Sequence, residues 1–182
     1  MLGVFSLLSA TAVIRAGESA EPAGVIDACT LLLVPEIERV IHAKVDSGER
    51  RDEGAAADGS YSSTCVWKIR IAPGRQDPQA PLGGQSFVIL NAVRWPAGSG
   101  LAHRFLDGFR AAAARGEIFH TPIPKPFGQE ALWWGDGLAV RENEVSFGIS
   151  VFSGRLQPKY RGFFEEQLAP DVLRRVKVSD HP

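Results

Sequence analysis

The sequence contains little cysteine, methionine and tyrosine, and it has no long block of one charge. Of its 182 residues, two are Cys, one is Met and two are Tyr. The 20 basic residues nearly balance the 21 acidic ones, which leaves a net charge of −1. A chain so close to neutrality lacks the long-range field of nucleic-acid-binding and polybasic membrane-binding proteins. We therefore expect no nucleic-acid partner.

Sequence motifs of catalysis and metal binding are also absent from the chain. The four histidines, His42, His103, His120 and His181, lie far apart, and none has metal-ligand spacing to another His, Cys or Asp. The sequence contains neither a Gly-rich phosphate motif nor a G-x-S-x-G nucleophile turn. We expect no metal and no cofactor, and we assign no catalytic residue.

The N-terminal segment lacks charge. Residues 1–14 contain one apolar stretch, which suits the hydrophobic region of a signal peptide and is too short to span a bilayer as a helix. No Lys or Arg precedes it, and a buried N-terminal helix or strand is the alternative. We interpret residues 1–24 as a signal peptide with a disordered entry segment, and residues 25–178 as a single domain. The mature protein is then periplasmic or extracellular, without a transmembrane segment.

The two cysteines, Cys29 and Cys65, allow two kinds of chemistry. An even count in an exported chain favours a disulfide. Such a bond would close a loop of about 36 residues and stabilise the fold by roughly 3–4 kcal/mol. The alternative is a thiol nucleophile, which would need an unpaired thiolate and a neighbouring base.

The pattern of apolar residues predicts an α+β fold. Helices are expected at Leu31–Ala43, Leu101–Arg115 and Phe164–Val176, the last with a kink at Pro170. Strands are expected at Cys65–Ile71, Phe87–Trp95, Ala131–Trp134, Leu138–Arg141 and Val145–Phe152, with Val45 opening a short additional strand. Asp46–Ser63 and Pro73–Gln85 are expected to be loops, and Thr121–Pro126 extended backbone. Hairpin turns between strands predict an antiparallel sheet of about five strands, with three helices packed on it.

Tryptophan supplies the one positive indication of a binding surface. Trp133 and Trp134 are consecutive on an expected strand, so their side chains should point to opposite faces of the sheet. If one face is open, a tryptophan there, near Lys125, would form a surface for a ligand or partner. Trp95, which follows Arg94 at the end of its strand, is a second candidate. If helices cover both faces, these tryptophans are ordinary core residues.

Several short segments resemble a pattern seen in small exported bacterial proteins, including actinobacterial lipoprotein families with a Cys-x-Leu-Leu helix followed by a Cys-x-Trp strand. The segments that carry the resemblance are Ile26–Leu32, Pro35–Ile41, Cys65–Trp67, Phe127–Trp133, Leu138–Arg141 and Leu168–Leu173. The resemblance implies a disulfide between Cys29 and Cys65 and a PsbP-like α/β/α sandwich. It supplies no agreed activity. The chain departs from the pattern at Val34, where Ser or Thr is usual, and at Ile41-His42, which replaces Leu-Gly.

These observations lead to one main functional hypothesis and two alternatives. The main hypothesis is a non-catalytic module of the cell envelope that binds a partner protein or a small apolar ligand. The first alternative is a hydrolase, thiol-dependent through Cys29 or Cys65 or of another kind. The second is a secreted enzyme inhibitor that inserts the loop Pro73–Gln85 into the cleft of its target.

Overall fold

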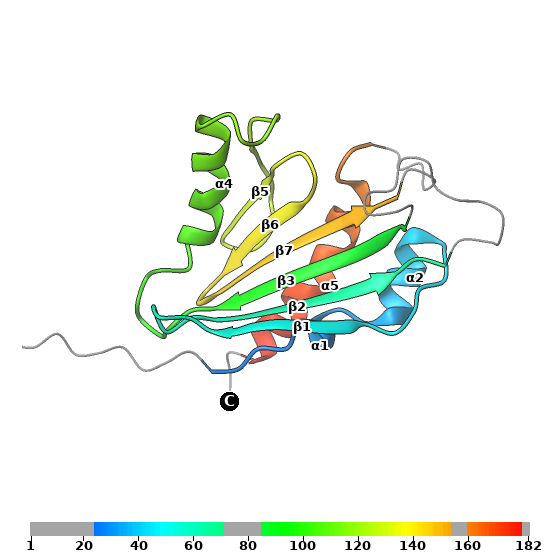
Figure 1. Cartoon of the computed structure of the whole chain (residues 1–182), viewed down its shortest axis with the longest axis horizontal. Coiled ribbons are helices and arrows are strands. Elements are labelled where there is room, and N and C mark those ends of the chain that lie inside the picture. The colour runs from blue at the N-terminus through cyan, green and yellow to red at the C-terminus, as the bar shows by residue number, and fades with distance from the viewer. Residues whose placement is uncertain (1–23, 71–84, 154–159, 180–182) are drawn as a thin grey trace, which may run out of the picture.

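A computed structural model describes residues 24–70, 85–153 and 160–179 of the chain. Within these residues the protein forms one antiparallel sheet with helices packed against it (Figure 1). The strands are β1 (Glu49–Ala55), β2 (Tyr61–Lys68), β3 (Phe87–Arg94), β4 (Ile123–Pro124), β5 (Glu130–Trp133), β6 (Leu138–Glu142) and β7 (Val145–Phe152). The helices are α1 (Ala28–Leu31), α2 (Val34–Ile41), α4 (Arg104–Ala114) and α5 (Phe163–Ser179).

The strands lie in the order β1-β2-β3-β7-β6-β5-β4, and every neighbouring pair is antiparallel. β3 pairs with β7 rather than with its successor in sequence, so α4, β4, β5 and β6 form an insertion between the two central strands. The predicted α+β class with an antiparallel sheet is confirmed. The predicted numbers of elements are wrong, because the described residues contain seven strands and four helices.

The largest correction concerns Asp46–Ser63, which the sequence predicts to be a loop. This segment contains β1 and the start of β2, which pair from Glu49 with Val66 to Ala55 with Tyr61. β1 is an outermost strand and its side chains are exposed or half-buried. Its charged sequence therefore lacks the apolar alternation by which a half-buried strand is identified.

Smaller differences concern the ends of elements. Val45 forms an isolated bridge with Ile69 instead of a strand. Helix α4 begins at Arg104, three residues after the predicted start. The expected signal peptide and most of the predicted loop Pro73–Gln85 lie outside the described residues. Among the described helices, none has the length and apolar character needed to cross a membrane.

The main core lies between the sheet and the helices α1, α2 and α5. Its buried residues run from Ile26 to Val176, so both ends of the described chain contribute to it. Trp67 and Phe147 are among its largest fully buried side chains, and burying a large apolar side chain stabilises a fold by roughly 1.5–3 kcal/mol. Helix α5 continues through Pro170 as one element. Helices α1, α2 and α5 thus cover one face of the sheet, and α4 packs against the other.

Helix α2 begins and ends without the usual capping residues. No side chain caps its first turn from Leu33, but Glu36 Oε2 accepts a hydrogen bond from the Leu33 N–H at 3.0 Å. His42 ends the helix in the left-handed conformation (φ 53°), which glycine most often adopts. Glu36 also binds Arg175 of α5 at 2.7 Å, so the helix is attached to its neighbour by an ion pair.

Candidate functional site

Helix α4 covers only part of the second face of the sheet, which we call the α4 face. One row of Cα partners crosses this face, in the order Leu132, Ala139, Gly148, Asn91, Thr64 and Arg51. At one end of the row, Leu132 and Ala139 pack against Leu106 of α4 and are buried. Farther along, Asn91 and Thr64 are only half-buried. The row therefore changes from a small core to an accessible surface.

Three aromatic side chains form a wall at this transition. The Trp134 ring stacks on Phe109 of α4, with ring centroids 4.3 Å apart and planes inclined by 17°. Phe105 meets Phe109 edge-on at 5.5 Å. A Cβ on Gly148 would lie 3.4 Å from Phe105 and 3.5 Å from Trp134. The aromatic wall therefore lies directly over the sheet at Gly148, beside Asn91, the Cα partner of Gly148.

The centre of the α4 face carries three uncharged polar side chains, Ser62, Thr64 and Asn91, which we call the Asn91 cluster. Asn91 Nδ2 donates hydrogen bonds to Thr64 Oγ1 at 2.9 Å and to Ser62 Oγ at 3.4 Å. Within the described part of the chain, the two hydroxyl protons and Asn91 Oδ1 have no partner. Two donors and one acceptor are therefore left for water or a ligand.

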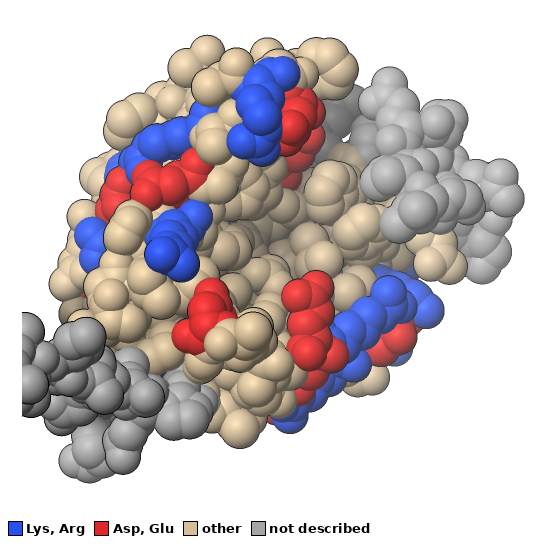
Figure 2. Space-filling model, turned by 60° about the vertical axis from the view of Figure 1, so that its left-hand side comes forward, with Lys and Arg blue, Asp and Glu red and all other residues tan. Residues whose placement is uncertain are grey.

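A hollow of about 530 Å³ opens beside the Asn91 cluster, near the turn between β1 and β2. This volume lies in the range typical of small-molecule sites. The lining residues come from β1, the β1–β2 turn, β2, β3 with the residue that follows it, and the start of α4: Glu53, Gly54, Ala55, Ala56, Ser60, Ser62, Asn91, Val93, Trp95 and Phe105. Figure 2 shows a surface that is hollowed in its middle, where uncharged residues gather, with charged side chains around the margin.

Trp95 contributes a buried hydrogen-bond donor to this lining. Its side chain is 9% exposed and packs with Val93 and Ala102. Its Nε1–H has no hydrogen-bond partner among the residues that the structure describes. A buried donor without a partner costs about 1–3 kcal/mol. The Nε1 atom itself is fully buried, so an acceptor could reach it only after a shift of the indole ring.

The charged groups around the α4 face are largely neutralised by one another. Glu53 is the one charged residue in the described lining, and it is exposed. At the end of the row, Arg51 pairs with Glu49 at 2.9 Å. Arg110 of α4 pairs with Glu130, and this hydrogen bond holds the pKa of Glu130 below its usual value. An uncharged floor with a balanced margin favours an uncharged ligand, because an unpaired buried charge is costly.

Both edges of the described sheet disfavour the addition of a strand from another protein. At the β4 edge, Lys125 directs its N–H to Ala131 of β5. By strand alternation the outward positions are Pro122, Pro124 and Pro126, which have no N–H to donate. At the opposite edge, β1 carries the exposed charged run 49–53 and a register irregularity between Asp52 and Gly54. A partner is thus expected at a face of the sheet rather than at an edge.

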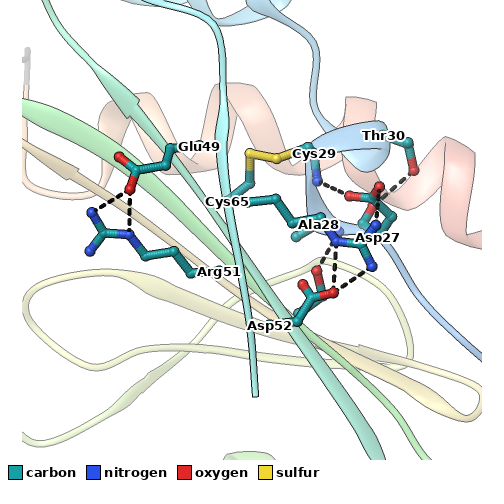
Figure 3. Close-up of a disulfide and its surroundings, with 10 residues drawn as sticks. Asp27, Ala28, Cys29, Thr30, Glu49, Arg51, Asp52 and Cys65 are labelled. Atoms are coloured by element: carbon teal, nitrogen blue, oxygen red, sulfur yellow. Dashed lines mark hydrogen bonds and ion pairs between the residues drawn. A yellow bond between two sulfur atoms is a disulfide. The ribbon is translucent and has the colours of Figure 1, made fainter. Parts of the chain in front are cut away.

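The disulfide between Cys29 and Cys65 joins α1 to β2 (Figure 3). It belongs to the main core, on the opposite side of the sheet from the hollow. Cys29 N–H donates to Asp27 Oδ1 at 2.8 Å, and Asp27 pairs with Arg50 of β1 at 2.9 Å. The bond and the ion pair together attach α1 to β1 and β2. The predicted pairing is confirmed. Because the described chain has no free cysteine, this oxidised form offers no thiol nucleophile.

The residues that the sequence singled out for binding are not brought together. Trp133 belongs to the main core, whereas Trp134 packs with α4, so the two point to opposite faces as expected for a strand. Trp95 lines the hollow. Lys125 lies beyond β4 and pairs with Glu166 at 2.5 Å, and Arg94 is half-buried at the end of β3.

Sequence reasoning missed the Asn91 cluster and Phe105. Asn91 interrupts the otherwise apolar run of β3 between Leu90 and Ala92. A polar residue in the middle of a strongly apolar strand was the one available signal. Ser62 and Thr64 lie in or next to the segment predicted to be a loop, and Phe105 lies inside the helix expected at Leu101–Arg115, with nothing in the sequence to mark it as a binding residue.

The acid with the most perturbed titration lies away from the hollow. Glu165 of α5 is 4% exposed and accepts a hydrogen bond from the Val151 N–H at 2.9 Å. Burial raises the pKa of Glu165 to about 7. It packs on the main-core side of the sheet, so it cannot serve as an acid or base for a molecule on the α4 face. The described residues also include no cluster of three or more His, Cys, Asp or Glu suited to hold a metal ion.

The geometry thus assembles one hollow with an aromatic wall, uncharged polar groups and an unpaired buried donor. Its described lining contains a single titratable side chain, Glu53. Comparison of the chain with protein-family models, with curated proteins and with solved structures found no match.

Proposed function

We propose that the protein is an exported, non-catalytic binding module that holds a small uncharged ligand in the hollow of the α4 face. The observation that carries the proposal is the convergence of two aromatic residues, Phe105 and Trp95, with the polar side chains of Ser62 and Asn91 on one hollow. Small-molecule sites typically combine apolar and aromatic walls with a few convergent polar groups. The charged side chains around the hollow are largely paired with one another, so they do not hinder the entry or exit of such a ligand.

The compartment and the finer fold belong to the same proposal. A disulfide between Cys29 and Cys65 supports export, because such bonds persist in oxidising compartments. The apolar N-terminal stretch supports a signal peptide, and a periplasmic or extracellular location follows. Helices α1, α2 and α5 on one face and α4 on the other suit a three-layer, PsbP-like α/β/α sandwich.

Binding is favoured over catalysis by the chemistry of the lining. Glu53 alone cannot form the pair of acid and base that hydrolysis requires. A thiol hydrolase would need reduction of the bond that holds α1 to β2. Both sheet edges disfavour strand addition by a partner protein, and the volume of the hollow, about 530 Å³, is that of a small-molecule site. The inhibitor hypothesis depends on residues 73–84, which lie outside the described residues.

Two adjacent alanines of the β1–β2 turn provide a matched test. Ala56 lines the hollow, whereas Ala57 is equally exposed and is not part of the lining. Ala56→Trp should obstruct the hollow, and Ala57→Trp should add the same side chain outside it. Saturation-transfer NMR with a panel of small saccharides, toluene and the anionic trisaccharide trigalacturonate measures binding. We expect signals that Ala56→Trp abolishes and Ala57→Trp preserves. Signals that are absent, or equal in both variants, would refute the site.

A further inference from the structure

We infer that the ligand is a neutral, hydroxyl-rich molecule, a saccharide unit, held between the Asn91 cluster and Phe105. This inference rests on the binding function proposed above and adds the chemical class of the ligand. Four features of the hollow carry it: the unused hydrogen-bonding groups of the Asn91 cluster, the buried Nε1–H of Trp95, the lack of charge on the floor and the aromatic side.

The first feature is the mixture of donors and acceptors that the Asn91 cluster leaves unused. Asn91 Nδ2 already binds Thr64 Oγ1 and Ser62 Oγ, so Asn91 Oδ1 remains as an acceptor. The hydroxyl groups of Ser62 and Thr64 remain as donors. A ligand hydroxyl can donate to the amide oxygen and accept from a neighbouring hydroxyl at the same time. A row of ligand hydroxyl groups therefore matches this cluster better than a ligand with acceptors or donors alone.

The second feature is the buried Nε1–H of Trp95. Trp95 is nine-tenths buried, lines the hollow and has no partner for this donor within the described chain. A ring or hydroxyl oxygen of a saccharide can accept from it once the indole ring turns toward the hollow, because Nε1 itself is fully buried in the free protein. A purely apolar ligand would leave this donor and the Asn91 cluster unpaired, and each such group costs about 1–3 kcal/mol when water is displaced.

The third feature is the lack of charge on the floor. A carboxylate or phosphate would find no Lys or Arg in the described lining, and an ammonium group would find only the exposed Glu53. Transfer of an unpaired charge into such a site is strongly unfavourable. A neutral ligand has no such cost.

The aromatic side of the hollow completes the match with a saccharide. Phe105 lines the hollow and approaches the sheet over Gly148, next to the Asn91 cluster. A pyranose ring has C–H groups on its faces and hydroxyl groups around its rim. Its face can pack on the phenyl ring while its rim reaches the cluster, which is the division into apolar wall and polar anchors typical of ligand pockets.

Isothermal titration with neutral oligosaccharides tests the inference on the full chain. The panel contains trimers of glucose, N-acetylglucosamine, mannose, galactose and arabinose, with toluene as an apolar probe and trigalacturonate as an anionic one. We expect at least one neutral trimer to bind. Asn91→Leu, which keeps the shape and removes the amide, should weaken that binding roughly 5- to 100-fold. Ser62→Ala should weaken it about 3- to 10-fold, and Thr121→Val, on a different surface, should not change it.

Trp95→Phe separates binding from folding. Removing the unpaired Nε1–H should weaken saccharide binding while the urea midpoint of unfolding changes little, because the loss of ring volume is offset by the loss of a buried, unpaired donor. If a neutral trimer bound the wild type and the three variants expected to weaken binding equally well, the inference would be overturned.

The panel also distinguishes failure of this inference from failure of the proposed function. Binding of toluene or trigalacturonate that Ala56→Trp abolishes, without any neutral saccharide, would overturn the ligand class and keep the binding site. An apolar ligand class would also show as tighter toluene binding by Asn91→Leu. If no probe of any class bound in the hollow, the proposed function itself would fail.

Discussion

The stability of the protein should depend on pH through one buried acid, Glu165 of α5. This side chain is 4% exposed, and its Oε1 accepts a hydrogen bond from the Val151 N–H at 2.9 Å. Burial raises its pKa from 4.5 to about 7, and the neighbouring charge of Glu166 acts in the same direction. The folded protein therefore holds a proton on Glu165 over a range of pH in which the unfolded chain has released it.

The sign and size of the effect follow from this difference in proton binding. Between pH 4.5 and 7 the folded state binds more protons than the unfolded state, so the free energy of unfolding falls as the pH rises. The fall is about 1.4 kcal/mol for each pH unit, or roughly 3 kcal/mol across the window. The contribution of Glu165 is complete below pH 4.5 and is lost above pH 7.

Glu165→Gln isolates this contribution, because its amide oxygen can still accept from the Val151 N–H and cannot ionise. Urea unfolding followed by tryptophan fluorescence at pH 5 to 8 gives the free energy of both proteins. Other acids act equally in both, including Asp58, whose pKa the Ser60 hydroxyl holds below its usual value, so they cancel in the difference. We expect nearly equal stability at pH 5 and a gain of about 3 kcal/mol for Glu165→Gln at pH 8.

A difference between the two proteins that did not change with pH would refute the reasoning. Glu165→Ala serves as the control for the hydrogen bond. It leaves the Val151 N–H without its acceptor, so it should lower the stability by about 1–3 kcal/mol at pH 5, where the charge of Glu165 has little effect. Equal behaviour of the Ala and Gln variants at pH 5 would show that this hydrogen bond contributes nothing.

Two further predictions concern the disulfide and the backbone that crosses it. Replacing Cys29 and Cys65 together with Ala should lower the free energy of unfolding by about 4 kcal/mol, since the bond joins residues 36 apart. Urea unfolding without reductant measures the loss. A loss below about 1 kcal/mol would contradict the loop-entropy argument. Gly48→Ala should lower the free energy of unfolding by about 1–3 kcal/mol, because its Cβ would lie 2.5 Å from Cys65 Sγ and 2.8 Å from Trp67 Nε1. Ser47→Ala, at an exposed neighbour, is the matched control. Equal urea midpoints of the two variants would contradict the predicted clash.

The sequence was sufficient for the parts of the fold that bury apolar side chains. The central strands illustrate this, because Val145–Phe152 was predicted with its observed bounds and Phe87–Trp95 within one residue of its end. Both strands lie in the middle of the sheet, where packing against the main core favours β-branched and aromatic residues. The pairing of Cys29 with Cys65 followed from cysteine count and was found.

The remaining features depend on contacts that no local pattern reveals. The pairing of β1 with β2 depends on backbone hydrogen bonds at an exposed edge, so its charged residues resemble those of a loop. The hollow depends on register, because Asn91 meets Gly148 only when β3 pairs with β7 across the whole insertion. Phe105 then approaches over Gly148. Sequence alone showed a glycine, an asparagine and a phenylalanine in three separate elements.

The composition of the α4 face is difficult to explain by stability alone. Asn is a poor strand former, and Asn91 occupies a central strand between apolar neighbours. The buried Nε1–H of Trp95 is also left without a partner in the described chain. Local choices that lower stability without a compensating contact are expected at functional sites. If Asn91 served the fold, Asn91→Leu would lower the urea midpoint; if it serves a ligand, the midpoint should stay or rise while saccharide binding weakens. The opposite pair of results would assign Asn91 to the fold.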